Sequence, residues 1–340
     1  MQNKDLTVIY FASDLFAEPC GVSIASLLDS NREFDTVSVY VMENGMTPGS
    51  RERLERIVES FGRTLHFIPM PDPQKYFGDS RFTVRTLGHT FGRMIVGDCL
   101  PKTVSRVLCL DSDMLVLDSL MELWNTDLQG CYVAGVDSAP GEAMMKKTRH
   151  MEAGSLYCNG GLFLMDLNAI RRDGMEEKYK AYISQAFDAG QCLGAYEEEV
   201  INRCCDGHML RLHPRYNLMT VNLVMGYDDF VRFRGAVNYY SRQEMEEAAK
   251  NPAILHAINT FYVRKRYWEQ GSDSPYADRY LYYREMTPWA KEAQIVANRS
   301  LKQKLMKEVW HWMPKKMAFF VAAFVRNEIR PRLAKKRDDE

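Results

Sequence analysis

Short apolar runs alternate with amphipathic stretches along the first hundred residues. Thr7–Phe11, Val37–Met42 and Leu65–Met70 are rich in β-branched, aromatic and aliphatic side chains, which predicts three strands. Between them, Gly21–Leu28 and Ser50–Gly62 repeat apolar residues at the spacing of one helix face. Strands that alternate with helices of about ten residues form βαβ units. The pattern therefore predicts an α/β fold with a mainly parallel central sheet.

The following segments continue this pattern and add a strand that is buried on both faces. Arg106–Leu110 is an almost continuous apolar run, typical of a central strand in a parallel sheet. A helix is expected before it, around Thr90–Leu100, and should end at Pro101. After it, Ser119 and Glu122 have the spacing of a helix capping box. Further strands are predicted at Tyr132–Val136 and Leu162–Asp166, and further helices near Glu176–Ala189 and Glu197–Cys204.

The end of the chain differs in composition from the rest. Residues 1–268 form one predicted α/β domain, and residues 269–340 form a predicted helical, basic and amphipathic region. Between Arg299 and Arg337, cationic side chains far outnumber acidic ones and are interleaved with aromatic rings. Such a stretch suits an anionic membrane surface, where each cation contributes about 1 kcal/mol. The alternative is a C-terminal helix that packs on its own domain and exposes a basic face.

Composition and charge exclude several classes of protein. With 46% hydrophobic and 26% charged residues, the chain is neither disordered nor fibrous. A net charge of -1 provides no general attraction for nucleic acid, and no nucleic-acid partner is expected. We expect no signal peptide, because the N-terminus has no charged region followed by an apolar run and a small-residue cleavage site. We expect no membrane span, because the longest apolar run, Met317–Val325, is too short. The 8 cysteines lack CxxC spacing, which favours reduced thiols. A cytoplasmic protein, peripherally associated with the inner face of the cell membrane, is expected.

Asp111, Ser112 and Asp113 directly follow the buried strand. Side chains alternate along an extended segment, so both carboxylates point the same way and repel each other unless a cation lies between them. Ligands bind at the carboxyl ends of strands in open parallel sheets. Mg²⁺ or Mn²⁺, held by carboxylates and substrate phosphates, accounts for this pair. The alternatives are a polar turn or a phosphatase-type nucleophile, which is expected on an earlier strand.

Other polar groups follow predicted strands or open predicted helices. Asp14 follows the first strand, and Arg93 opens a helix where it could bind diphosphate oxygens. Asn159 offers an amide to hydroxyl groups, and two adjacent glycines permit close approach of a ligand. His256 follows a strand-like run and precedes several cations. Simpler readings exist for these segments: a turn for Asn159–Gly161, helix-start acids for Glu197–Glu199, and a structural histidine at 256.

Taken in order, these motifs resemble glycosyltransferase family 8, which includes bacterial lipopolysaccharide galactosyl- and glucosyltransferases and glycogenin. The resemblance covers roughly residues 6–268 and rests on FASD, FGR, RVLCLDSDMLVLDSL, VAGVD, YCNGGLFLMDL, YEEEVIN, RYN and a late LHxxN…RYW. It implies a Rossmann-like GT-A fold and transfer of a hexose, glucose or galactose, from a UDP-sugar with retention at the anomeric carbon. The basic tail favours a glycan or lipid-linked acceptor, in cell-surface polysaccharide or lipopolysaccharide synthesis.

The resemblance also implies a role for each candidate residue. The implied ligands of Mn²⁺ (or Mg²⁺) are Asp111, Asp113 and His256. The donor would contact Asp14 at the uracil end, Arg93 and Arg266 at the diphosphate, and Asn159, Asp137 and Glu197 around the sugar. Ser112, Gly160 and Gly161 complete the implied donor-binding set, and Glu198, Glu197 and Asn159 form the implied catalytic group.

The chain departs from the family pattern at several positions. Glu198 replaces a glutamine that lies beside the anomeric carbon, and a carboxylate there can act as a nucleophile. Leu15 interrupts the usual Asp-Asn pair, and Asn259 replaces a glycine. The phosphate-binding cation is left open among Arg264, Lys265 and Arg266. A catalytically silent sugar-nucleotide or glycan-binding module at the membrane is the alternative function. A metal-dependent nucleotidyltransferase is disfavoured, because residues 11–21 contain a single glycine.

Overall fold

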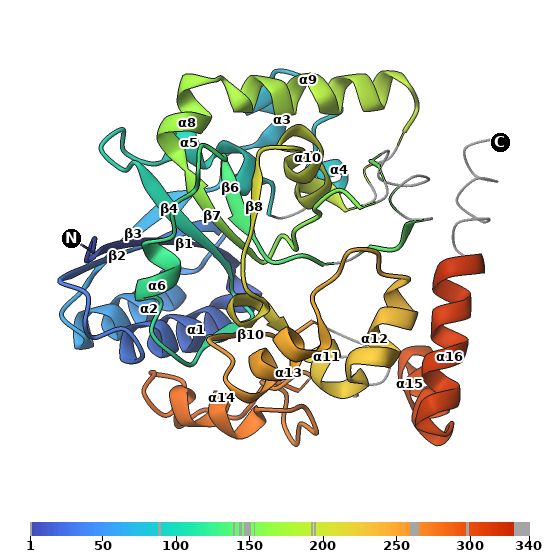
Figure 1. Cartoon of the computed structure of the whole chain (residues 1–340). Coiled ribbons are helices and arrows are strands. Elements are labelled where there is room, and N and C mark those ends of the chain that lie inside the picture. Colours follow the sequence, from blue (N-terminus) through green and yellow to red (C-terminus); the bar gives the residue numbers. More distant parts are fainter. Residues whose placement is uncertain are drawn as a thin grey trace.

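The structure of the protein is a computed structural model, and a central sheet lies at its core (Figure 1). The structure describes residues 2–87, 90–138, 140–142, 145, 151, 152, 154–191, 193, 195–258, 265–296 and 299–329. The sheet has 7 strands in the order β3-β2-β1-β4-β7-β6-β8. Their bounds are β1 Asp5–Ser13, β2 Thr36–Asn44, β3 Thr64–Pro69, β4 Arg106–Asp111, β6 Val133–Gly135, β7 Leu162–Asp166 and β8 Met209–Arg211.

The sheet is mixed but mostly parallel, which confirms the predicted α/β class. β1 lies parallel to both β2 and β4, β2 is parallel to β3, and β6 is parallel to β8. β7 is the exception, since it runs antiparallel to β4 and to β6. The carboxyl ends of β1 and β4 meet where Phe11 pairs with Asp111. Residues that follow these two strands are therefore brought to one edge of the sheet.

Helices cover both faces of the sheet (Figure 1). On one face lie α1 Ala17–Asp29, α2 Pro48–Ser60 and α6 Met121–Trp124; toward the other lie α3 Pro73–Phe77, α4 Val84–Leu87, α5 Val96–Cys99, α8 Leu167–Arg172, α9 Met175–Asp188 and α10 Tyr196–Cys204. β1 contributes side chains to the hydrophobic clusters on both faces of the sheet, because side chains alternate along a strand. Val8 and Tyr10 join one hydrophobic cluster, while Ile9 and Phe11 join the other.

A small second sheet places the last part of the site. It consists of β5 Met114–Val116, β10 Ile254–His256 and β9 Leu218–Met219, in the order β5-β10-β9. β5 follows the Asp111–Asp113 turn directly and runs antiparallel to β10, so that Met114 pairs with His256. A histidine more than a hundred residues away is thereby positioned beside the acidic pair. The remaining elements nearby are the 3₁₀ turn Pro214–Asn217 and helices α11 Thr220–Met225, α12 Tyr227–Arg234 and α13 Arg242–Lys250.

One local prediction was right only in part, and another was wrong. The helix expected over Thr90–Leu100 is a 3₁₀ turn, Phe91–Ile95, followed by the single turn α5. Gly92 and Gly97 weaken a helix there, and both are held by close packing, since a Cβ at Gly97 would lie 2.7 Å from Glu176. The capping box at Ser119 is absent from α6. The Ser119 hydroxyl binds Glu33, and Glu122 accepts a hydrogen bond from Tyr216.

The segment after residue 268 begins with a helix that packs into the main core. Helix α14, Ala277–Arg284, lies against α1, and its Tyr280 is fully buried. Arg284 forms a buried ion pair with Glu18 of α1, at 2.7 Å between Nε and Oε1. This helix lies beyond the predicted domain boundary at residue 268, and yet it shares the hydrophobic core of the α/β domain.

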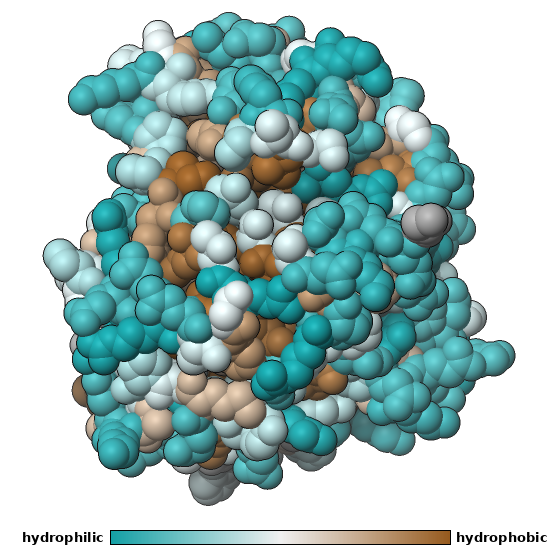
Figure 2. Space-filling model, turned by 90° about the vertical axis from the view of Figure 1, so that its left-hand side faces the viewer, coloured by the Kyte–Doolittle hydropathy of each residue, from teal (hydrophilic) through white to brown (hydrophobic). Residues whose placement is uncertain are grey.

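The last two helices differ in how far their apolar side chains are buried. α16, Lys315–Phe324, lies against α12, and its Phe319 is buried with Met219 and Phe230. α15, Leu301–Trp312, instead exposes large apolar side chains. Figure 2 shows the side of the molecule that lies at the left in Figure 1, away from these two helices; this side is mostly hydrophilic with scattered apolar areas. Among the described residues, no helix has the length and hydropathy needed to cross a bilayer.

Candidate active site

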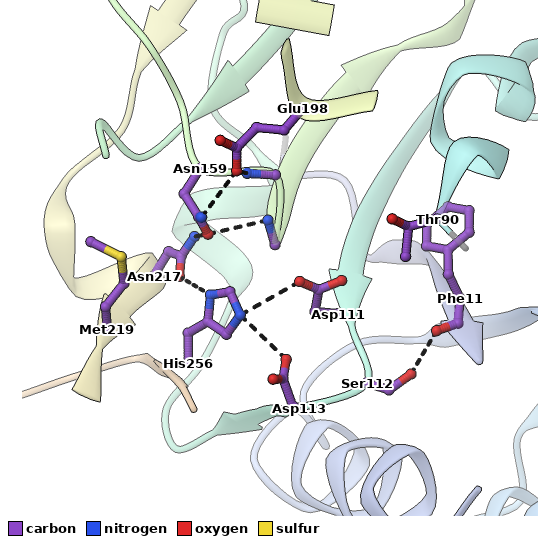
Figure 3. A network of polar contacts seen from close by, with 12 residues as sticks. Phe11, Thr90, Asp111, Ser112, Asp113, Asn159, Glu198, Asn217, Met219 and His256 are labelled. Carbon is purple, nitrogen blue, oxygen red and sulfur yellow. Dashed lines mark hydrogen bonds and ion pairs between the residues drawn. The ribbon is translucent and has the colours of Figure 1, made fainter. Parts of the chain in front are cut away.

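Three predicted metal ligands come together at the junction of the two sheets (Figure 3). His256 Nε2 lies 3.2 Å from Asp113 Oδ1 and 3.5 Å from Asp111 Oδ2. One ligand atom from each residue lies within 4.8 Å of the others. Two carboxylate oxygens and one imidazole nitrogen form a donor set that Mn²⁺ and Mg²⁺ accept. These residues therefore fit a divalent cation, as the sequence predicted.

The turn between the two aspartates is tied to the neighbouring strand. Ser112 is buried, and its hydroxyl donates to the carbonyl oxygen of Phe11 at 2.8 Å. Ser112 thus fixes the turn and leaves the carboxylates on either side of it to face the cation position. Burial alone would raise the pKa of Asp113, but the charges of His256 and Arg266 outweigh it and lower that pKa. Asp113 is accordingly favoured in its charged form, which is the form that binds a cation.

A chain of amide hydrogen bonds connects His256 to Glu198 (Figure 3). His256 Nδ1 lies 3.0 Å from Asn217 Oδ1, and Asn217 Nδ2 donates to Asn159 Oδ1 at 2.9 Å. Asn159 Nδ2 in turn donates to Glu198 Oε2 at 3.2 Å. The backbone N–H of Gly160 donates to the same oxygen at 2.8 Å. Two predicted catalytic residues, Asn159 and Glu198, are therefore part of one network with a predicted metal ligand.

Arg93 and Glu197 lie behind the acidic pair. Arg93 is buried, with Nη1 at 2.6 Å from Glu197 Oε1 and Nη2 bonded to Asp111. Burial raises the pKa of Glu197, and the charge of Arg93 together with a hydrogen bond from Thr90 only partly offsets this effect. Both terminal nitrogens of Arg93 bind carboxylates of the chain. Its contacts thus position Asp111 and Glu197, and the diphosphate contact expected from the resemblance stays a prediction.

A cavity of about 570 Å³ opens beside the metal-ligand candidates. Asp111 and Asp113 line it together with Asp14 and Arg266, which come from opposite ends of the α/β domain sequence. Asp14 accepts hydrogen bonds from the Thr47 N–H and hydroxyl at 2.9 and 2.8 Å. These bonds lower the pKa of Asp14. The cavity is therefore lined by three carboxylates and one guanidinium.

The comparisons with known proteins identify the family. The sequence profile described as "Glycosyl transferase family 8" matches residues 7–261. The chain belongs to glycosyl transferase family 8. It is 25% identical over 289 residues to general stress protein A of Bacillus subtilis (strain 168). This alignment covers 85% of this chain and 96% of that protein.

Solved structures of similar fold include two of the galactosyltransferase LgtC. One, in complex with donor and acceptor sugar analogues, has a TM-score of 0.65 and 20% sequence identity, covering 88% of this chain and 100% of that chain. The other is an LgtC active-site mutant with glutamate in place of glutamine, with a TM-score of 0.66 and 20% identity over 84% of this chain and 98% of that chain. The mixed, mostly parallel sheet is thus the GT-A fold of LgtC.

Within this family 8 fold, the remaining predicted residues have clear places. Asp137 is buried, and its backbone forms an isolated antiparallel β-bridge with Cys158. Its Oδ2 lies 3.7 Å from Arg211 Nη2. A Cβ at Gly161 would lie 2.3 Å from Cε1 of His256. This glycine therefore admits the imidazole of a metal-ligand candidate. The sequence suggested that it admits a ligand directly.

The positions of two of the three candidate phosphate-binding cations can be compared. Arg266 lines the cavity, and its guanidinium carbon lies 4.9 Å from the ring centroid of Trp268. Lys265 Nζ instead donates to the carbonyl oxygen of Gln270 at 2.7 Å. Arg264 and Asn259 lie outside the described residues. Of the two described cations, Arg266 is the one that faces the acidic pair.

Sequence reasoning missed the contacts of Asn217. It lies in the RYN motif that contributes to the family resemblance, but no role was assigned to it. The structure places it between His256 and Asn159, with 2% exposure. Thr90, whose hydroxyl binds Glu197, was missed as well. The available signal was an amide at the end of the RYN motif, which does not reveal which partners the amide meets.

Proposed function

We propose that this family 8 glycosyltransferase transfers glucose or galactose from a UDP-sugar, with retention, to a glycan or glycolipid acceptor of cell-surface polysaccharide or lipopolysaccharide synthesis. The observation that carries the proposal is the convergence of Asp111, Asp113 and His256 at one side of a cavity of about 570 Å³. Asp14 and Arg266 line the same cavity. A nucleoside diphosphate needs a cation for its phosphates and polar groups for its base and ribose. This cavity offers candidate ligands for the cation, and Asp14 is a polar group for the nucleoside.

The donor would bind along the cavity. Asp14, beyond the end of β1, is assigned to the uracil–ribose part, and Arg266 is assigned to the diphosphate, since a guanidinium binds phosphate oxygens in a bidentate manner. Asp111, Asp113 and His256 would hold Mn²⁺ or Mg²⁺. When bound, the cation neutralises negative charge on the departing diphosphate. Arg93 supports the site from behind, because it holds Asp111 in place through a buried ion pair.

Glu198 is proposed as the nucleophile of a double displacement. Its Oε2 is oriented by the Gly160 N–H and the Asn159 amide, which both donate hydrogen bonds to it. In the first step a Glu198 oxygen bonds to the anomeric carbon while the bond to the UDP oxygen breaks. In the second step the acceptor oxygen bonds to the anomeric carbon while the bond to Glu198 breaks, and the acceptor proton passes to a phosphate oxygen of UDP or to water. Two inversions give retention.

The C-terminal helices are proposed to hold the enzyme on an anionic membrane surface at the inner face of the cell membrane. On α15, Leu301, Leu305, Val309 and Trp312 are all more than half exposed and recur at helical spacing. Lys304 and Lys307 lie between them in the sequence. A helix with an apolar stripe and flanking cations binds lipid surfaces. Association with the membrane would bring a lipid-linked acceptor to the enzyme.

The test is a panel of UDP-sugars incubated with the full-length protein and Mn²⁺. We expect Mn²⁺-stimulated release of UDP from UDP-glucose or UDP-galactose, and NMR of the product with an added glycan should show the donor's anomeric configuration. A catalytically silent binding module would retain UDP-sugar without releasing UDP. Binding of UDP-sugar without release of UDP at any metal concentration would therefore contradict the proposed enzymatic activity and favour the binding module.

A further inference from the structure

A hydrogen-bond chain of one fixed direction ends at His256. Asn159 Oδ1 accepts from the Gly161 backbone N–H at 3.2 Å and from Asn217 Nδ2 at 2.9 Å. Asn217 Oδ1 then lies 3.0 Å from His256 Nδ1 (Figure 3). All members are buried or half-buried. Their roles as donors and acceptors are therefore restricted to one another.

The direction of the chain is set by groups that cannot reverse. The oxygen and nitrogen of a side-chain amide are assigned from its hydrogen-bond partners. The Gly161 backbone N–H can only donate, so the Asn159 oxygen must face it. The opposite end of Asn159 faces Glu198 Oε2 at 3.2 Å, and a carboxylate can only accept. A reversed Asn159 would set donor against donor at Gly161 and acceptor against acceptor at Glu198.

The orientation of Asn159 determines that of Asn217. Because the Asn159 oxygen accepts, Asn217 must present Nδ2 to it and Oδ1 to His256. A carbonyl oxygen accepts only, so Nδ1 of His256 carries a proton. The lone pair of a neutral imidazole is then on Nε2, which is the nitrogen that lies near Asp111 and Asp113.

We infer that Asn217 is a positioning residue that fixes the tautomer and ring orientation of His256 for a divalent cation, and that Asn159 transmits this constraint from Glu198 and the Gly161 backbone. The inference rests on the proposed function, since it assumes the cation site. Partners of this kind orient a metal-bound histidine, and their loss typically costs 10–100-fold in metal affinity. The ring is confined on another side by Gly161, where a Cβ would lie 2.3 Å from Cε1.

Mn²⁺ binding to full-length variants tests the inference without reference to turnover. Asn217→Ala removes the acceptor at Nδ1, and we expect Mn²⁺ affinity to fall about 10–100-fold. The ¹⁴N modulation from His256 in the electron spin echo of bound Mn²⁺ should weaken. Asn217→Asp keeps an oxygen at Nδ1 and should retain that modulation. Asn222→Ala is the matched control, because Asn222 is a buried amide on α11 whose Nδ2 contacts Tyr239 and which takes no part in the chain.

Each outcome bears on a different claim. If Asn217→Ala binds Mn²⁺ within about two-fold of the unmodified protein and keeps the ¹⁴N modulation, the inference is overturned while the cation site stands. If the unmodified protein binds no Mn²⁺, or shows no ¹⁴N modulation, the proposed function itself fails. Should Asn217→Ala not fold, Asn159→Ala provides the same test, since it frees the Asn217 amide to rotate. Weakened affinity in that variant supports the inference, and unchanged affinity overturns it.

Discussion

Arg93 and Glu197 form a buried ion pair, with 2.6 Å between Nη1 and Oε1. The second terminal nitrogen of Arg93 binds Asp111, so one guanidinium joins the first turn of α10 to a metal-ligand candidate at the end of β4. Burial opposes the charge of Arg93, but the adjacent Asp111 and Glu197 outweigh this and raise its pKa. The guanidinium therefore stays charged and compensates two carboxylates that would otherwise repel each other.

Replacing Arg93 with methionine should strongly destabilise the protein. Asp111 and Glu197 would lose their shared cation, and removal of one partner of a buried ion pair costs about 3–5 kcal/mol. Urea unfolding measures the loss. Arg32→Ala is the control, because Arg32 forms an exposed pair with Asp29 at 2.8 Å, and such pairs contribute about 1 kcal/mol or less. Equal effects of the two substitutions would show that the Arg93 pair does not stabilise the fold.

Asp113→Ala should abolish Mn²⁺ stimulation of UDP release. Asp113 Oδ1 lies 3.2 Å from His256 Nε2, and its loss leaves Asp111 and His256 as an incomplete donor set. The measurement is the rate of UDP release as a function of Mn²⁺ concentration. Asp118→Ala removes an aspartate that follows β5 but binds Arg215 outside the site, and it should keep the Mn²⁺ response. An unchanged response in Asp113→Ala would remove Asp113 from the ligand set.

Glu198→Gln should lower transfer by about 100-fold or more, equivalent to about 2.7 kcal/mol of barrier. The amide keeps an oxygen for the Gly160 N–H and the Asn159 amide, so the fold and donor binding should persist. What it lacks is a charged oxygen that can bond to the anomeric carbon. Turnover of UDP-sugar with saturating Mn²⁺ is the readout. Near-normal turnover would exclude the covalent route and leave same-face attack on an ion pair.

The sequence predicted those parts of the site that depend on local pattern. The apolar run before Asp111, the alternation of strands and helices, and the family motifs were sufficient for the GT-A fold and for the Asp111, Asp113 and His256 group. The sequence did not predict which side chains contact one another. Arg93 binds Asp111 and Glu197, and Asn217 lies between His256 and Asn159, because strands far apart in the sequence pair in space. Periodicity reports which face of an element is buried, and it contains no information about such long-range contacts.

The carboxyl pair of Asp98 on α5 and Glu176 on α9 should make stability depend on pH. Burial, followed by the nearby Asp98, raises the pKa of Glu176 from 4.5 to about 8. The folded state therefore binds more protons than the unfolded state between these values, so the free energy of unfolding should fall as pH rises from about 4.5 to about 8. Asp98 has a lowered pKa, and its contribution is lost only in more acidic solution.

Glu176→Gln removes this titration and should flatten the curve of stability against pH. The amide can still accept from the Asp98 N–H, which lies 2.9 Å from Oε1 of Glu176. Urea unfolding between pH 5 and 8 provides the measurement, with Glu177→Gln, the exposed neighbour, as control. Identical curves for the unmodified protein and Glu176→Gln would mean that Glu176 titrates normally in the folded state.

Membrane association is best tested by point substitution, because truncation would disturb the fold. Phe319 of α16 is buried with Met219 and Phe230, so deletion after residue 300 would uncover this cluster. Leu305 and Val309 of α15 are 67% and 55% exposed, and their replacement by glutamate should leave the core intact. Charge in the apolar stripe opposes both burial in lipid and attraction to anionic headgroups. Binding to phosphatidylglycerol vesicles should fall about ten-fold or more, while Val237→Glu, an exposed valine outside the tail, should bind normally. Undiminished sedimentation of Leu305→Glu/Val309→Glu with vesicles would show that α15 is not the contact.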